Sequence, residues 1–83
     1  MKNRCVLDLD VAESFLRLPS RQRAVLLKIF HHITDNMHVS SKAGFRDPGG
    51  RWIEQKVVEG WEISYWEDGP VWEVRIVGVR KTK

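Results

Sequence analysis

The chain has 83 residues, enough for one hydrophobic core and too few for two, so we expect a single domain over residues 1–83. Hydrophobic residues make up 42% of the chain and charged residues 30%, a balance that excludes an intrinsically disordered protein. The formal net charge of +3, with a pI near 9.4, favours an acidic partner such as nucleic acid or an acidic protein segment.

Few residues of the chain are suited to metal binding or to disulfide formation. Cys5 is the single cysteine, so no internal disulfide can form, and the three scattered histidines lack the spacing that zinc sites use. We therefore expect no metal and no cofactor. Asp8 and Asp10 interrupt the first apolar stretch well before it reaches the length of a signal peptide or a membrane span. These features predict a cytoplasmic protein that does not contact a membrane.

The N-terminal part predicts a strand followed by a short helix. Residues 6–9 are mostly apolar and predict the strand. Asp10 stands three residues before Glu13, which is the spacing of a capping box, and predicts the start of a helix over residues 11–18. Pro19 ends this helix. Its apolar residues share one face at i, i+4 and i+7 spacing: Val11, Phe15 and Leu18.

The next segment predicts a longer helix. Ser20 is suited to cap its N-terminus, and Asn36 is suited to end it. The apolar positions recur at i, i+3, i+4 and i+7, the pattern of a helix that buries one face: Leu26, Ile29, Phe30 and Ile33.

The rest of the chain predicts a loop and then a sheet. Residues 37–50 are rich in Ser, Gly and Pro and predict a loop with a brief strand near Phe45. From Arg51 the hydrophobic period changes to two, which predicts three antiparallel strands in a meander, over residues 51–58, 61–66 and 72–77. Gly69 and Pro70 lie in the hairpin turn over residues 67–70, where we expect Gly69 to take positive φ and Pro70 to begin the last strand.

This order predicts an α+β fold: an N-terminal strand, a helical pair and a three-stranded antiparallel meander, with the helices packed on one face of the sheet. The residues predicted to meet the helices alternate along the last two strands: Trp61, Ile63, Tyr65, Trp72, Val74 and Ile76. Trp66 alternates out of phase with them and is expected on the opposite face.

Three stretches within residues 4–80 carry a resemblance to a known family. They read Ser14-Phe15-Leu16-Arg17-Leu18-Pro19, Glu59-Gly60-Trp61-Glu62-Ile63-Ser64-Tyr65 and Val74-Arg75-Ile76-Val77-Gly78-Val79-Arg80. They resemble the RelE/ParE toxin superfamily of bacterial toxin–antitoxin modules. The resemblance implies a RelE-like fold and, in ribonuclease members, cleavage of messenger RNA in the ribosomal decoding site by a concave sheet face lined with Lys and Arg.

The chemistry of such cleavage explains why the family uses these residue types. Attack of a 2′-hydroxyl on the adjacent phosphate needs a base, cations for the developing charge and an acid for the leaving oxygen. This chain departs from that pattern. Lys56 is the one lysine on a strand where the family presents several, and Glu62 stands where the family places a catalytic arginine. A carboxylate at that position repels the phosphate. The resemblance therefore implies that the chain retains the fold of the family but lacks part of its ribonuclease site.

The residues predicted to bind RNA are basic side chains that contact phosphate and one indole that stacks on a base: Arg51, Lys56, Trp66, Arg75, Arg80 and Lys81. The candidate catalytic bases are His38, in the loop, and Glu62. Neither has the paired acid or orienting group that would make the assignment specific.

Three functions remain open at this point. The first is a RelE/ParE-like toxin that inhibits growth by acting on translation, of the mRNA interferase type and with a degenerate endoribonuclease site. The second is a noncatalytic ParE-like or protein-binding domain of the same fold. The third is a small nucleic-acid-binding adaptor domain, because a fold does not determine its function. The resemblance implies a cognate acidic antitoxin as partner, together with the ribosome or mRNA.

Overall fold

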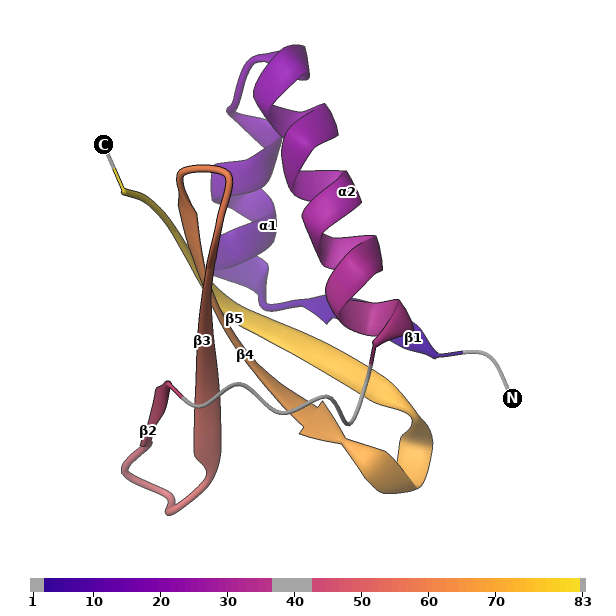
Figure 1. Cartoon of the computed structure of the whole chain (residues 1–83), viewed down its shortest axis with the longest axis vertical. Coiled ribbons are helices and arrows are strands. Elements are labelled where there is room, and N and C mark those ends of the chain that lie inside the picture. Colours follow the sequence, from indigo (N-terminus) through magenta and orange to yellow (C-terminus); the bar gives the residue numbers. More distant parts are fainter. Residues whose placement is uncertain (1–2, 37–42, 83) are drawn as a thin grey trace.

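The computed structural model describes residues 3–36 and 43–82. The chain forms a strand, two helices and then four strands (Figure 1). The elements are β1 (Arg4–Leu7), α1 (Leu9–Leu16), α2 (Ser20–Asp35), β2 (Gly44–Arg46), β3 (Trp52–Val58), β4 (Trp61–Asp68), a short 3-10 helix η1 (Gly69–Val71) and β5 (Glu73–Lys81). The predicted α+β class is confirmed.

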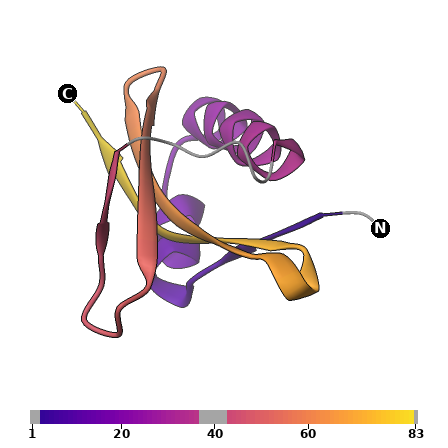
Figure 2. The same ribbon diagram turned by 60° about the horizontal axis from the view of Figure 1, so that its bottom comes forward.

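The strands form one mixed sheet in the order β1-β5-β4-β3-β2. β3, β4 and β5 are the expected antiparallel meander, and β2 is the brief strand expected near Phe45. β1 pairs parallel with β5, which makes β5 an inner strand. The sheet is strongly twisted, so the η1 end of the β4–β5 hairpin turns away from β3 (Figures 1 and 2).

The hydrophobic core lies between the helices and one face of the sheet. The face bearing Trp61, Ile63 and Tyr65 is the buried one, as the alternation predicts. The rings of Phe15 and Phe30 pack at 6.0 Å between centroids, which joins the two helices above the sheet. The cluster consists of Val11, Leu26, Ile29, Phe30, Ile33, Trp61, Ile63, Tyr65, Val74 and Ile76.

The helix starts differ from the prediction. α1 begins at Leu9, which is 78% exposed and does not belong to the first strand. Asp8 occupies the N-cap position without a side-chain cap, so the capping role predicted for Asp10 is wrong; Asp10 lies in the first turn, where its charge complements the helix dipole. In α2, Pro19 holds the N-cap position and Ser20 is the first helical residue, so Ser20 does not cap this helix.

The hairpin turn also differs from the prediction. η1 carries the chain from β4 to β5, and Trp72 follows it in the left-handed conformation, with φ of 57°. β5 therefore begins at Glu73, and Trp72 is 39% exposed, so its predicted place in the core is wrong. Pro70 lies in η1, not at the start of the strand. Trp72, not Gly69, is the residue of this turn that takes positive φ.

A bulge in β5 changes which side chains face the helices. Ser64 pairs with Gly78 and Tyr65 pairs with Ile76, so Val77 is an extra residue on β5. Beyond Val77 the alternation is shifted by one, and Val79 packs against the core. The bulge thereby decides the face on which the basic C-terminal end of β5 presents each side chain.

Replacing Phe30 with Ala tests the core. Phe30 is 3% exposed and contacts Phe15, so Phe30→Ala should lower the free energy of unfolding by about 3–5 kcal/mol, through lost burial and the cavity that remains. Leu27→Ala is the matched control on the same helix, because Leu27 is 45% exposed and its loss should cost about 1 kcal/mol or less. Urea unfolding measures both, and equal effects would contradict this core.

Candidate functional site: the open face of the sheet

The open face is the face of the sheet that lies away from the helices. Cross-strand partners project from the same side of a sheet, so the register identifies its members. Glu62 pairs with Arg80 and Trp66 pairs with Arg75, both out of phase with the buried residues. Trp66 lies on the face opposite the core, as predicted. The side chains of the open face are Arg4, Val6, Phe45, Ile53, Gln55, Val57, Glu62, Ser64, Trp66, Asp68, Glu73, Arg75 and Arg80.

At one end of the open face, an ion pair joins Glu62 to Arg80. The Glu62 Oε1 and Arg80 Nη2 atoms are 2.9 Å apart, within hydrogen-bond distance. Glu62 is the more buried partner, with a side-chain exposure of 22% against 75% for Arg80. The carboxylate therefore neutralises the arginine that the last strand presents at this end, and the pair lacks the excess positive charge that a phosphate needs.

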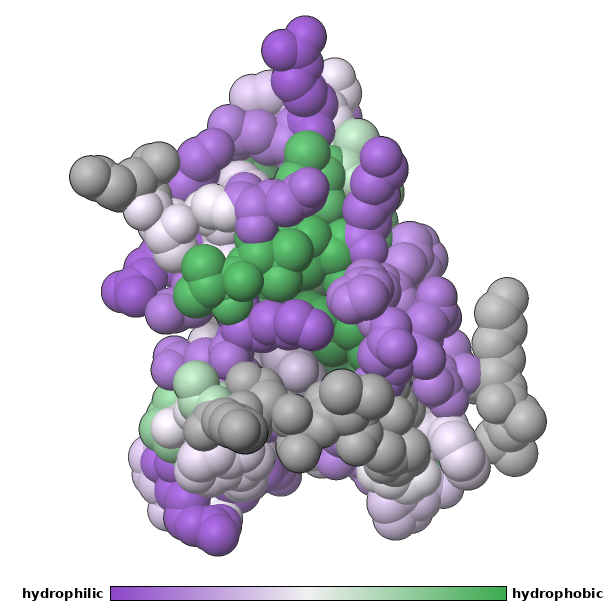
Figure 3. All heavy atoms as spheres, viewed as in Figure 1, coloured by the Kyte–Doolittle hydropathy of each residue, from purple (hydrophilic) through white to green (hydrophobic). Residues whose placement is uncertain are grey.

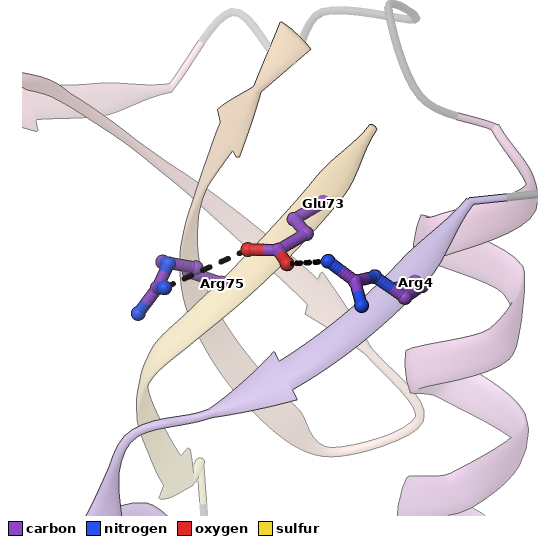
Figure 4. A network of polar contacts seen from close by, with 3 residues as sticks. All are labelled: Arg4, Glu73 and Arg75. Atoms are coloured by element: carbon purple, nitrogen blue, oxygen red, sulfur yellow. Dashed lines mark hydrogen bonds and ion pairs between the residues drawn. The ribbon is translucent and has the colours of Figure 1, made fainter. Parts of the chain in front are cut away.

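At the other end, Glu73 lies between two arginines (Figure 4). Its side chain is 11% exposed and is bonded by Arg4, which comes from β1. Its second carboxylate oxygen lies 3.6 Å from Arg75 Nη2. A carboxylate this buried needs such partners, because an unpaired charge in the same place would cost several kcal/mol. Glu73 thus connects β1 to β5 electrostatically.

Trp66 lies beneath two guanidinium groups. The Arg51 Cζ atom is 4.0 Å from the centroid of the indole ring, and the Arg75 Cζ atom is 5.8 Å from it. Both distances are in the range of cation–π attraction. Asp47, in the turn before β3, lies 3.9 Å from Arg51. The open face therefore has three charged groups: the closed pair of Glu62 and Arg80, Glu73 between Arg4 and Arg75, and the stack of Arg51 and Arg75 on Trp66.

The structure separates the six residues predicted to bind RNA. Arg75, Arg80 and Trp66 project from the open face, and Arg51 reaches over it to Trp66. Lys56 pairs with Ile63, and Lys81 pairs with Trp61, so both project from the face that bears the helices. The six residues therefore do not share one surface but lie in two groups on opposite faces, and their role in RNA binding stays a prediction. Of the two candidate bases, Glu62 is engaged by Arg80, and His38 lies outside the described residues.

Two members of the open face carry no local signal in the sequence. Glu73 follows Trp72 in an apparent alternation, which suggested an exposed position, yet Glu73 is 8% exposed. Arg4 is 69 positions away from it along the chain. Only the parallel pairing of β1 with β5 brings the two together, with Arg4 directly opposite Glu73 in the register. Local sequence patterns do not encode such a long-range parallel pair.

An apolar groove opens on the helix-bearing side of the molecule. It has a volume of about 260 Å³ and runs between the helices and the C-terminal end of β5, with Phe15, Leu18 and Trp61 in its wall and Lys81 beside them. The Lys81 Nζ atom lies 5.0 Å from the Trp61 ring centroid. Figure 3 shows hydrophobic atoms gathered between hydrophilic margins on this side. Apolar surface of this kind commonly marks a protein-binding site.

Tyr65, the single tyrosine of the chain, is buried on the helix-bearing face at 3% exposure. Burial raises the pKa of Tyr65 to about 12, and the charges of Glu54 and Glu67 act in the same direction. Its hydroxyl stays protonated at neutral pH. Tyr65 therefore does not reach the open face.

Residues 3–36 and 43–82 hold no cluster of three or more His, Cys, Asp or Glu side chains that is suited to a metal ion. Within the same ranges, neither helix combines the length and apolar character that crossing a membrane requires.

Comparison with known proteins identifies the fold. No protein-family model and no curated protein matches the sequence. Among solved structures, the isolated RelE toxin of E. coli superposes with a TM-score of 0.72 at 16% identity, over 98% of this chain and 85% of that chain. The intact E. coli RelBE toxin–antitoxin complex contains a chain that matches at 0.71 and 15% identity, over 98% of both chains.

An archaeal relative gives the same result. In the RelE–RelB complex from Pyrococcus horikoshii, the TM-score is 0.71 at 14% identity, over 99% of this chain and 97% of that chain. The chain therefore has the fold of the RelE toxins, and the fold implied by the sequence resemblance is confirmed. At these identities the likeness describes the backbone, and the side chains of the open face decide the chemistry.

Alkaline titration tests the burial of Tyr65. Tyrosinate absorbance should rise near pH 12, about two units above the pKa of an exposed tyrosine. Because the folded pKa is raised, the unfolded chain loses this proton first, and the free energy of unfolding should fall as the pH rises from about 10 to about 12. Tyr65→Phe should abolish both the absorbance change and this part of the pH dependence. A transition near pH 10 in the folded protein would place Tyr65 at the surface.

Proposed function

We propose that this protein is the toxin of a toxin–antitoxin module, that an acidic antitoxin is its partner and that translation in the cytoplasm is its target. The observation that carries the proposal is the RelE fold over nearly the whole chain. Two of the matching structures are complexes of RelE with RelB, which supports an antitoxin as partner. The positive net charge supports an acidic partner and an RNA target.

The apolar groove is the surface that we assign to the antitoxin. Its wall offers Phe15, Leu18 and Trp61 to the apolar side of an amphipathic segment. Lys81 at its margin offers a positive charge to a carboxylate. A segment that folds on binding gains affinity from apolar burial and orientation from such a charge pair.

The ribonuclease activity of this toxin should be weak or absent. Glu62 stands at the position where the family places its charge-stabilising arginine, and its carboxylate also neutralises Arg80, the residue opposite it on β5. Losing one such donor alone lowers a rate by roughly 10²–10³. The same observation favours the second candidate function, a noncatalytic ParE-like or protein-binding toxin of this fold. His38 is retained as a candidate base for any residual activity.

Replacing Glu62 with Arg separates these two functions. Glu62→Arg removes the carboxylate and frees Arg80, so a latent ribonuclease site should gain roughly 10²-fold in cleavage of messenger RNA on programmed ribosomes. Glu13→Arg is the matched control, because it makes the same charge change at an exposed position on α1 and should leave cleavage as in the wild type. Absence of cleavage in all three proteins, together with growth inhibition in cells, would assign the noncatalytic function.

Charge reversal at the groove tests the partner. We expect the reading frame beside this one to encode an acidic protein; that protein is the probe, and it should bind the toxin and restore growth when both are expressed. Lys81→Glu places a negative charge at the groove margin and should weaken this binding by roughly tenfold, whereas Lys28→Glu, on the exposed surface of α2, should not. Calorimetry measures the affinities, and equal effects of the two changes would exclude the groove.

A further inference from the structure

The stack on Trp66 is not explained by the fold alone. Arg51 comes from the turn before β3 and Arg75 from the middle of β5, yet both guanidinium groups converge on one indole. Arg51 lies closer, at 4.0 Å from the ring centroid. Two positive charges that share one aromatic ring repel each other, so an anion between them would relieve the repulsion.

The hydrogen-bond donors of these two arginines are available. Arg75 is 3.6 Å from Glu73 and Arg51 is 3.9 Å from Asp47, and both distances exceed a good hydrogen bond. The other Glu73 oxygen, Oε2, accepts a hydrogen bond from Arg4. Among the residues that the structure describes, neither side chain donates a hydrogen bond. By contrast, Arg80 is held by Glu62 at 2.9 Å.

The turn that carries Arg51 is fixed by its own hydrogen bonds. The Arg51 amide donates to the Asp47 carboxylate at 2.9 Å, and the Gly50 amide donates to the Asp47 carbonyl at 2.9 Å. Arg46 donates from its guanidinium to the Gly50 carbonyl at 2.9 Å. Gly50 takes a φ of 85°, which a side chain would disfavour. This turn holds Arg51 over Trp66, so less conformational entropy is lost when a ligand binds.

We propose that Arg51, Trp66 and Arg75 form a binding site for one nucleotide of single-stranded RNA, with the phosphate between the two guanidinium groups. The nucleobase stacks on the outer plane of the Arg51 guanidinium, whose inner plane lies on the indole. Guanidinium planes and indoles are both stacking surfaces for unpaired bases. Arginine also presents paired donors that match two phosphate oxygens. The choice of RNA as ligand rests on the proposed action on translation.

This site is separate from the Glu62–Arg80 pair. Trp66 is four residues beyond Glu62 on β4, which corresponds to roughly 13 Å along a strand. RNA contact at Trp66 therefore does not depend on a competent cleavage site, and a toxin without ribonuclease activity keeps it. The site has no base-reading hydrogen-bond pattern, so binding should depend little on RNA sequence.

RNA binding by the full chain tests the proposal, with fluorescein-labelled decauridine as the probe and anisotropy as the measurement. Arg51→Ala, Arg75→Ala and Trp66→Ala should each weaken binding by roughly tenfold or more, and Trp66→Phe should weaken it less because a ring remains. Binding should weaken steeply between about 50 mM and about 200 mM salt. Lys28→Ala on α2 is the matched control and should bind as the wild type, and circular dichroism verifies that each variant is folded.

Three results would overturn the proposal. Decauridine that does not bind, or that binds equally well after Arg51→Ala and Arg75→Ala, excludes the site. An equal loss from Arg80→Ala or Lys28→Ala moves the contact elsewhere. An oligoglutamate peptide that binds more tightly than decauridine, with the same dependence on Arg51 and Arg75, identifies the ligand as an acidic protein segment.

Growth inhibition and antitoxin binding distinguish this proposal from the proposed function. If both persist while decauridine does not bind, the nucleotide site is excluded and the toxin assignment stands. If decauridine binds through Trp66 while expression of the chain leaves growth and translation unchanged, the site stands and the toxin assignment fails.

Discussion

The position of β5 inside the sheet is the constraint on which the rest of the structure depends. β5 pairs with β1 on one side and with β4 on the other, so it links the N-terminal strand to the meander. Its first residues, Val74 and Ile76, are fully buried beneath the helices. The bulge at Val77 then reverses the alternation, and the C-terminal half of the strand presents Arg80 to the open face and Lys81 to the groove. Without that extra residue the two side chains would exchange faces.

The charges of the open face are balanced mainly within the protein. Glu62 and Glu73 are the buried partners of their ion pairs, and each holds an exposed arginine from another strand. Cations that are already paired contribute little to phosphate binding, because the phosphate either has to displace the paired carboxylate or is repelled by it. A net charge of +3 therefore overstates the attraction of this face for RNA. On this face, positive charge is least compensated over Trp66, where the guanidinium groups of Arg51 and Arg75 lie.

The sequence predicted the elements and the core because both depend on local periodicity. The apolar spacing in α2 and the alternation along β4 each repeat over several residues, so a single atypical residue does not hide them. The prediction of buried positions was wrong where a single residue interrupts the hydrophobic periodicity. Trp72 adopts positive φ after η1 and leaves the core, and Val77 adds an extra residue that only the neighbouring Gly78 marks in the sequence. The basic residues of the candidate site were predicted from the sequence, but the bulge and the strand register place them on two opposite faces of the sheet.

The division of basic side chains between two faces has a consequence for the two ligands that we propose, an antitoxin and RNA. Lys81 and the groove lie on one side of the sheet, whereas Arg51, Trp66 and Arg75 lie on the other. An antitoxin seated in the groove leaves the opposite side uncovered. The two ligands then do not compete for the same surface, and a ternary assembly of toxin, antitoxin and RNA is sterically compatible with the fold.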